Sequence, residues 1–238
     1  MESLEAELRR ARELSVTELA DAIESIGFEC TRCGACCTAD EPIERDGTEG
    51  GSDGVEPHTA TLFPDEARRL RDAASESFDE PHEWRDVARP MPYGVDGDGP
   101  DATGETFEWA IQTDPCGDCA FYTEADDGVG ACTVHADRPL VCRTYPFSVA
   151  LGGTSEPLGD AVDREGIVRA HECEGLGRDI AREDARELAS ALKERAIREL
   201  KEAIALRDRY EPRPDVDGVV VHDSEGQKRA DGTPLETR

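Results

Sequence analysis

The segment Cys30-Thr-Arg-Cys33-Gly-Ala-Cys36-Cys37 places four thiols within eight residues and decides how the rest of the chain is interpreted. Five further cysteines follow it, at positions 116, 119, 132, 142 and 173. A single cysteine is most often a small buried hydrophobic residue, but nine, with four of them in one octet, need a shared explanation. In a reducing compartment, cysteines in this number favour metal binding over disulfide bonds. The sequence therefore predicts a metal-binding domain built around clustered thiolates.

The overall charge is strongly negative and narrows the range of partners. The 238 residues carry 55 acidic and 27 basic side chains, a formal net charge of −28, and only three of the bases are lysines. Such a surface repels nucleic acids and anionic membrane surfaces, so we expect neither as a partner. An excess of acids with few lysines resembles the surfaces of proteins from extreme halophiles, where high salt screens the repulsion.

The location of the protein is predicted from its first residues and its hydropathy. The N-terminal segment MESLEAELRRARELS is charged and has no apolar stretch, so it does not resemble a signal peptide. No run of residues approaches the ~18 apolar residues that a membrane-spanning helix requires. We therefore expect a cytoplasmic protein, and in the reducing cytosol this number of cysteines favours metal over disulfides.

Hydrophobic periodicity and turn residues predict an α+β fold, in which a small cysteine-rich domain with short strands is flanked by helices. The expected sections are an N-terminal helical segment at 1–27, the cysteine-cluster metal-binding domain at 28–177 with a loop at 38–57, a long C-terminal helix packed on that domain at 178–210, and a disordered polar tail at 211–238. A capping box at Ser15-Val-Thr-Glu18 splits the first segment into two helices. Turn residues at 126–130 predict a hairpin, and alternation over 107–113 predicts a strand.

The chemistry of thiolates limits the metals that the cysteines would bind. Thiolates are soft ligands that select zinc, cuprous copper or the iron of iron–sulfur clusters. Cys30, Cys33 and Cys36 are each separated by two residues, as are the first three ligands of ferredoxin-type clusters, and this favours a [4Fe–4S] cluster. Because Cys-x-x-Cys pairs also bind zinc, the spacing leaves both cofactors open.

The adjacent pair Cys36-Cys37 bears on the number of metal atoms. Neighbouring side chains of extended backbone point to opposite faces. Two such thiolates would bind two metals or different parts of one polynuclear cluster, so we expect more than one metal atom per chain. A disulfide between the two is the competing interpretation, but it would be strained and disfavoured in a reducing compartment.

Two arginines flank one of the later cysteines, in Arg138-Pro139-Leu-Val-Cys142-Arg143. A guanidinium is always protonated, and a nearby cation stabilises thiolates and offsets the negative charge of a multi-thiolate site. Arg138 and Arg143 are therefore candidate cofactor-binding residues. The alternative is that both form ion pairs with the abundant surface acids.

The order and spacing of the cysteines resemble those of the CxxCxxCC cysteine-cluster family, also called the YkgJ family, whose domain is described as zinc- or iron-chelating. The resemblance covers roughly residues 28–173. It rests on Phe28-x-Cys30-x-x-Cys33-Gly34-x-Cys36-Cys37, Cys119-x-Phe121, Cys132, Arg138-Pro139-x-x-Cys142-Arg143-x-Tyr145-Pro146-Phe147 and Cys173. It implies eight metal ligands, which are Cys30, Cys33, Cys36, Cys37, Cys119, Cys132, Cys142 and Cys173.

Three residues near this pattern stand outside the implied ligand set. Cys116 is additional to the family's pattern, and His135 stands where the family usually has an aromatic residue. His135 and His171 are types of side chain that bind zinc, but we do not expect them as ligands because the thiolates already suffice.

A thiolate metal centre is compatible with three kinds of function. The leading hypothesis is a binding module, in which an iron–sulfur cluster or zinc completes a lean hydrophobic core and can serve as a redox centre. The second is an enzyme, either an iron–sulfur oxidoreductase or a methyltransferase-like modifier of protein side chains, since the flagellin lysine N-methylase resembles this family in its cysteine cluster. The chain lacks a recognisable glycine-rich loop for S-adenosylmethionine and the CxxxCxxC of radical enzymes. The third is metal handling, in which the thiols carry metal to other molecules.

Overall fold

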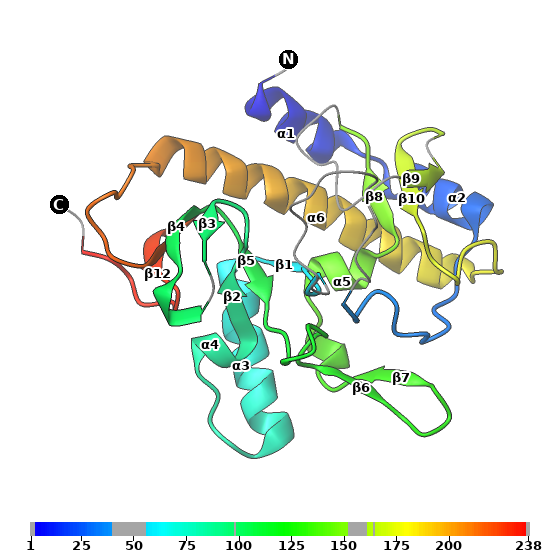
Figure 1. The fold of residues 1–238 in the computed structure, drawn as a ribbon. Helices are drawn as coiled ribbons and strands as arrows, with labels where there is room; N and C mark the ends of the chain where they lie inside the picture. The colour runs from blue at the N-terminus through cyan, green and yellow to red at the C-terminus, as the bar shows by residue number, and fades with distance from the viewer. Residues whose placement is uncertain (1–2, 40–55, 98, 152–160, 164, 237–238) are drawn as a thin grey trace, which may run out of the picture.

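The computed structural model describes residues 3–39, 56–97, 99–151, 161–163 and 165–236. It confirms the α+β class, with two helices at the N-terminus, several small sheets and a long helix near the C-terminus (Figure 1). The described helices are α1 (Leu4–Glu13), α2 (Val16–Ile26), α3 (Pro64–Phe78), α4 (Trp84–Val87), α5 (Leu140–Thr144) and α6 (Arg182–Arg209), with short 3₁₀ turns η1 (Gly99–Asp101) and η2 (His135–Asp137). Most of the loop expected at 38–57 lies outside the described residues.

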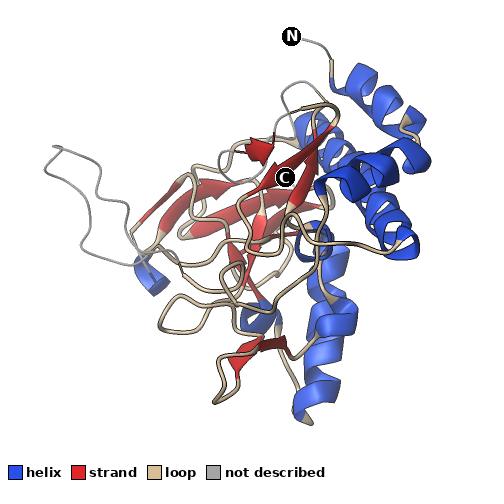
Figure 2. Cartoon of the chain, turned by 90° about the vertical axis from the view of Figure 1, so that its right-hand side faces the viewer, coloured by secondary structure: helices blue, strands red, loops and turns tan. Residues whose placement is uncertain are grey.

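The strands of the described residues form four small sheets. The first sheet has the strand order β1 (Thr61–Leu62), β5 (Trp109–Ile111), β2 (Ala88–Pro90), and the second has the order β8 (Phe147–Val149), β10 (Val168–His171), β9 (Ala161–Asp163). The third sheet has the order β12 (Gly226–Arg229), β11 (Val219–Asp223), β4 (Thr103–Thr106), β3 (Val95–Asp96). The fourth is the hairpin of β6 (Tyr122–Glu124) and β7 (Gly130–Cys132). β11 and β4 pair in parallel, and the other neighbours are antiparallel. Figure 2 shows the long helices along one side of the molecule and most strands on the other.

Several local predictions are confirmed by these elements. Ser15 caps α2, and its Oγ accepts a hydrogen bond of 3.3 Å from the backbone N–H of Glu18, so the N-terminal segment is split into two helices as the capping box predicts. β5 lies within the predicted strand at 107–113. β6 and β7 form the predicted hairpin, with Tyr122 opposite Cys132.

The first hydrophobic cluster joins the two ends of the chain. The apolar faces of α1 and α2 pack against α6 and against the sheet of β8, β9 and β10. Phe147 lies within this cluster and contacts Phe28 edge to face, with ring centroids 5.7 Å apart. Arg195 of α6 is buried and donates to Thr144 Oγ1 at 3.0 Å, which ties α6 to α5.

Among the residues that the structure describes, no helix is both long enough and apolar enough to cross a membrane.

The second hydrophobic cluster contains or contacts four of the cysteines. It is built from α3, the sheet of β1, β5 and β2, and strand β11. Trp109 of β5 is fully buried and packs edge to face on Trp84, with ring centroids 4.9 Å apart. Four of the nine cysteines belong to this cluster or pack against it, namely Cys37, Cys119, Cys132 and Cys142.

The expectation of a disordered tail at 211–238 is wrong for the described part of that segment. All five residues of β11 are buried, and the strand lies between β4 and β12. The polar residues of the hairpin are satisfied internally: buried Asp223 accepts hydrogen bonds from Trp109 Nε1 at 2.8 Å and from Lys228 Nζ at 2.6 Å. The prediction failed because a short apolar run, Val219 to Val221, is hidden among polar and turn-forming residues.

We expect the Val221→Ala substitution to lower the free energy of unfolding by about 2 kcal/mol, because it removes two buried methyl groups and leaves a cavity. Val221 is 0% exposed, whereas Val162 is 61% exposed and serves as the matched control. Val162→Ala should change the free energy of unfolding little. Urea denaturation followed by circular dichroism measures both, and equal transition midpoints would show that the β11 hairpin contributes nothing to the fold.

Candidate metal centre

The first cysteine cluster lies on a loop that leaves α2 and ends in a tight turn. The carbonyl of Gly34 accepts hydrogen bonds from the backbone N–H of Cys37 at 2.6 Å and of Thr38 at 3.1 Å. Three of its thiols, those of Cys30, Cys33 and Cys36, belong to exposed residues, and Cys37 is half-buried. The loop therefore leaves three of its cysteine residues exposed and packs the fourth against the protein, and the contact with the Cys37 thiol together with burial raises the pKa of Cys36.

Glycine at position 34 is required by the way this loop packs on the β6–β7 hairpin. Gly34 has φ +82°, and a Cβ atom built there would lie 2.2 Å from Tyr122 Oη. The Tyr122 ring thus lies directly against the loop backbone, and its hydroxyl donates to Glu124 at 2.9 Å. Any larger residue at 34 would both adopt a disfavoured backbone conformation and displace the tyrosine.

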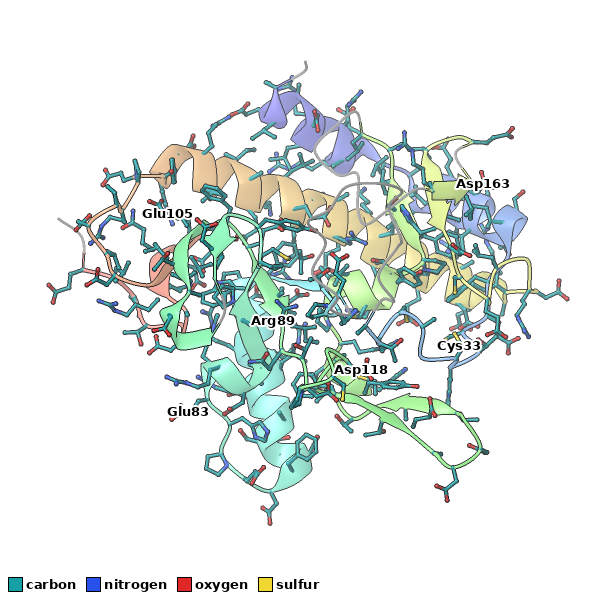
Figure 3. All side chains as sticks on the ribbon, in the orientation of Figure 1. Cys33, Glu83, Arg89, Glu105, Asp118 and Asp163 are labelled. Atoms are coloured by element: carbon teal, nitrogen blue, oxygen red, sulfur yellow. The ribbon has the colours of Figure 1, made fainter. Side chains whose placement is uncertain are left out.

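Three hydrogen bonds attach the loop to the segment that carries the middle cysteines. The backbone N–H of Cys119 donates to the carbonyl of Cys37 at 2.8 Å, and the N–H of Gly130 donates to the carbonyl of Arg32 at 2.8 Å. The N–H of Ala39 donates to Asp118 Oδ1 at 2.8 Å, next to Cys119. Figure 3 labels Cys33 and Asp118, which lie on the two segments that are joined here.

Cys142 lies on α5, and a buried carboxylate holds the start of that helix. Glu66 of α3 is 1% exposed, and its Oε1 accepts a hydrogen bond of 2.9 Å from the N–H of Leu140, the first residue of α5. Its Oε2 accepts from the N–H of Phe63 at 3.2 Å. Burial raises the pKa of Glu66, and these N–H donors and Arg198 act in the opposite direction. Glu66 therefore fixes the position of α5 relative to α3.

Cys173 is brought beside Cys30 by a close contact between two backbone segments. The N–H of Glu29 donates to the carbonyl of Gly175 at 3.0 Å, and Phe28 forms an antiparallel bridge with Leu176. A Cβ atom at Gly175 would lie 2.2 Å from the carbonyl oxygen of Glu29, so only glycine permits this approach. The N–H of Gly175 also points to Cys173 Sγ at 3.4 Å.

Electrostatic interactions connect the thiols that these contacts bring together. Burial raises the pKa of Cys119 to about 11, and it also raises the pKa values of Cys132, Cys142 and Cys173. The charges of Cys119, Cys36 and Cys132 raise the pKa of Cys142 further. Those of Cys36, Cys33 and Cys30 do the same for Cys173. Cys36 thus lies within electrostatic range of both groups of later cysteines.

The two candidate arginines occupy different environments. The positive charge of Arg138 opposes, without reversing, the rise in the pKa values of Cys36, Cys132 and Cys142, and its Nε donates to the carbonyl of His135 at 3.1 Å. Its place beside the thiols fits the expected compensation of thiolate charge. Arg143 is exposed on α5, on the residue that follows Cys142.

The residues outside the implied ligand set are placed as follows. Cys116 is exposed, and its backbone N–H donates to Asp114 Oδ1 at 2.8 Å within a turn. His135 is exposed in η2, and the nearby charge of Arg138 lowers its pKa. His171 is buried, its Nε2 lies 3.0 Å from Ser148 Oγ, and burial lowers its pKa.

The expectation that the side chains of Cys36 and Cys37 point to opposite faces is wrong. The two Sγ atoms lie 3.9 Å apart, because the pair belongs to a turn and not to extended backbone. Four sulfurs at ~2.3 Å from one tetrahedral ion are ~3.8 Å from one another. The 3.9 Å separation is therefore compatible with both thiolates on one ion and equally with two adjoining ions. The neighbouring positions of Cys36 and Cys37 in the sequence thus do not determine the number of metal ions.

The sulfur donors are of the type that soft metals prefer, although the side chains are not arranged to coordinate a single ion within the described residues. Within the described residues, no three cysteine, histidine or acidic side chains are arranged to hold a single ion. The convergence lies in the backbone, where hydrogen bonds join the loop of residues 30–39 to the segments of Cys119 and Cys173. Exposed thiols change rotamer at little cost, and thiolates from several segments are the ligands that zinc and iron select.

Two residues that shape this region were missed by sequence reasoning. Glu66 follows the Phe63-Pro64 start of α3 and has the position of an ordinary capping residue, with no sign that it also holds α5. Tyr122 is polar enough to belong on an exposed hairpin, and its packing on Gly34 depends on the tertiary structure. The Cys-Gly sequence at 33–34 was the available signal, since a glycine inside a ligand loop often marks a close approach.

The comparisons with known proteins give one match. No curated protein and no solved structure matches the chain. The model of a family described as "CxxCxxCC: Putative zinc- or iron-chelating domain" matches residues 29–174, which is more than half of the chain and includes all eight cysteines of the implied ligand set. The loop of clustered cysteines and the segments that pack against it are therefore those of the matched domain, and the chain belongs to the CxxCxxCC family of zinc- or iron-chelating domains.

Proposed function

We propose that this protein binds zinc or iron through the thiolates of Cys30, Cys33, Cys36, Cys37, Cys119, Cys132, Cys142 and Cys173, and that bound metal stabilises its fold. In the iron form the thiolates would hold an iron–sulfur cluster, which would add a redox function. We also propose that the protein works in the cytoplasm, because the thiols of such a centre must stay reduced until metal binds.

The observation that carries the proposal is the convergence of cysteine-bearing segments that lie far apart in the sequence. Cys119 donates to the carbonyl of Cys37, and Glu29 donates to the carbonyl of Gly175, two residues after Cys173. α5, which carries Cys142, is held by Glu66. These contacts bring the cysteine-bearing segments of residues 29–39, 119, 140–144 and 173–175 into one region, as a shared metal centre requires.

The charge of the region supports a bound cation. Four thiolates around one divalent ion leave a net charge of about −2, which a nearby guanidinium partly offsets. Arg138 is in electrostatic range of Cys36, Cys132 and Cys142. We propose that Arg138 compensates the thiolate charge and that Arg143, which is exposed, does so from further out.

Metal would also complete the core. The loop of residues 30–39 runs from α2, which packs in the first hydrophobic cluster, to Cys37, which packs against the second, and its first three cysteines are exposed. Metal binding free energy acts as folding free energy when the site does not exist in the unfolded chain. The bound ion would therefore hold together segments that hydrophobic burial alone holds weakly.

Anaerobic purification followed by elemental and acid-labile sulfide analysis tests this function. Stoichiometric zinc without colour would indicate zinc sites, and iron with sulfide and a visible band that bleaches on reduction would indicate an iron–sulfur cluster. Fully reduced, folded protein that binds neither zinc nor iron on reconstitution would contradict the proposal.

Metal binding should weaken as the pH falls. Burial and neighbouring thiols raise the pKa values of Cys119, Cys132 and Cys142, so these thiols are protonated in the metal-free protein at neutral pH, and a metal ion must displace their protons. The apparent affinity is then expected to rise about tenfold per pH unit for each displaced proton. Calorimetric titration with zinc in two buffers of different ionisation enthalpy measures the protons released, and an affinity independent of pH would contradict this expectation.

A further inference from the structure

The eight thiols differ in their surroundings in a way that divides them into two sets of four. We propose, resting on the metal-binding function above, that they form two separate ion sites, an inner one enclosed by the second hydrophobic cluster and an outer one open to solvent, and that only the outer ion exchanges readily with other ligands. The ligands of the inner site are Cys37, Cys119, Cys132 and Cys142. The ligands of the outer site are Cys30, Cys33, Cys36 and Cys173.

The inner set is defined by shared packing. Cys119 is 7% exposed and is part of the second hydrophobic cluster, against which the other three members pack. The backbone of Cys119 is bonded to that of Cys37 at 2.8 Å, and Cys132 is paired across the hairpin with Tyr122, whose N–H donates to the carbonyl of Cys119. Cys142 is held from the other side, because Glu66 fixes the start of α5. An ion bound here would be surrounded by apolar side chains that slow the entry of water and competing ligands.

The outer set is defined by exposure and by the contact between the segments of Cys30 and Cys173, whose neighbours Phe28 and Leu176 pack against the first hydrophobic cluster. Cys30 and Cys173 are joined through the Glu29–Gly175 hydrogen bond and the bridge between Phe28 and Leu176. Cys30, Cys33 and Cys36 are exposed, and none of the four outer cysteines belongs to the second hydrophobic cluster. An ion bound here would keep a face that solvent and a competing thiol or chelator can reach.

The boundary between the two sites falls within the pair Cys36-Cys37. Cys37 packs against the second hydrophobic cluster, whereas Cys36 is exposed. Their sulfurs lie 3.9 Å apart, so the two sites adjoin and Cys36 is the outer thiol nearest to the inner set. This arrangement assigns the metal-handling role to one of the two ions. The inner ion would stabilise the fold, and the outer ion would be transferred to or received from another thiolate ligand.

Chelator kinetics on zinc-loaded full-length protein test this division. Native mass spectrometry should find two zinc ions per chain, and a colorimetric zinc chelator should remove one of them about tenfold or more faster than the other. The Cys33→Ser variant should bind one ion, which leaves at the slow rate, with a melting temperature close to that of the unmodified protein. Cys132→Ser should lose the slowly released ion. The matched control Cys116→Ser should keep both ions and both rates.

The outcomes separate this inference from the proposed function. If no zinc or iron binds, the proposed function itself fails. If metal binds but both ions leave at one rate, or Cys33→Ser loses the slowly released ion, the division is wrong and metal binding stands. A single four-iron cluster with four sulfides would likewise overturn it. Should Cys132→Ser fail to fold, the two release rates of the unmodified protein and the single rate of Cys33→Ser still decide the question.

Discussion

Replacement of Cys119 by serine is expected to remove the inner, slowly released metal ion and to lower the melting temperature by roughly 10–20 °C. Cys119 is the most buried cysteine at 7% exposure, and its backbone joins the middle segment to the carbonyl of Cys37. Serine is a poor ligand for soft metals, and its hydroxyl would be buried among apolar side chains. A loss of about 5 kcal/mol of metal-linked folding free energy corresponds to this shift in a chain of this size.

The matched control for this experiment is Cys116→Ser. Cys116 lies only three residues away, is exposed and stands outside the cysteine pattern of the family. The control should keep the metal content and the melting temperature of the unmodified protein. Differential scanning calorimetry with and without a strong chelator measures both effects, because chelation should lower the melting temperature of the unmodified protein toward that of Cys119→Ser. Equal metal content in the two variants would exclude Cys119 as a ligand.

Replacement of Glu66 by alanine is expected to lower the free energy of unfolding by about 3 kcal/mol and to weaken metal binding by roughly 10–100-fold. The buried carboxylate accepts the N–H of Leu140 at 2.9 Å, and its removal leaves that donor unsatisfied at the start of the helix that carries Cys142. Glu66 contacts no thiol in the described residues, so its effect on metal would act through the position of α5.

Glu66→Gln separates the hydrogen bond from the charge. Glutamine keeps a carbonyl oxygen for the N–H of Leu140 and removes the charge that burial disfavours, as the raised pKa of Glu66 indicates. It should therefore retain most of the metal affinity but lose part of the stability, because its amide nitrogen cannot accept the N–H of Phe63 as Oε2 of Glu66 does. Zinc competition titrations and denaturant unfolding measure the two quantities. A Glu66→Ala variant with unchanged zinc affinity would show that α5 is positioned by packing alone.

The parts of the fold that were predicted from sequence depend on local signals. Ser15 and Glu18 lie within one helical turn, so the break between α1 and α2 is specified by adjacent residues. The turn residues between Tyr122 and Cys132 likewise specify a hairpin without reference to the rest of the chain. The cysteine pattern consists of short motifs, and their order and spacing over residues 28–173 indicate the family without reference to the fold.

The parts that were not predicted depend on contacts between distant residues. β11 is apolar over only three residues and becomes a buried strand because β4, more than 100 positions earlier, pairs with it. Glu66 holds an α5 residue 74 positions away, and its own segment contains no sign of that partner. The 3.9 Å approach of Cys36 and Cys37 depends on a turn whose conformation is fixed by packing on Tyr122. Propensity and periodicity describe neighbours in the chain and so carry no information about these pairs.

The packing of α1 and α2 on α6 has a consequence for biosynthesis. The two N-terminal helices emerge from the ribosome first, but the helix that covers their apolar faces starts at Arg182, 156 residues after α2 ends at Ile26. At ordinary elongation speeds of roughly 5–20 residues per second, those faces stay uncovered for roughly 8–30 s. Cys173 is translated just before α6, so this thiol and the cover for α1 and α2 are synthesised at nearly the same moment. Coordination of metal by all eight cysteines would therefore come only after Cys173 is translated, and until α6 follows, a chaperone that shields apolar helices would protect the growing chain from aggregation.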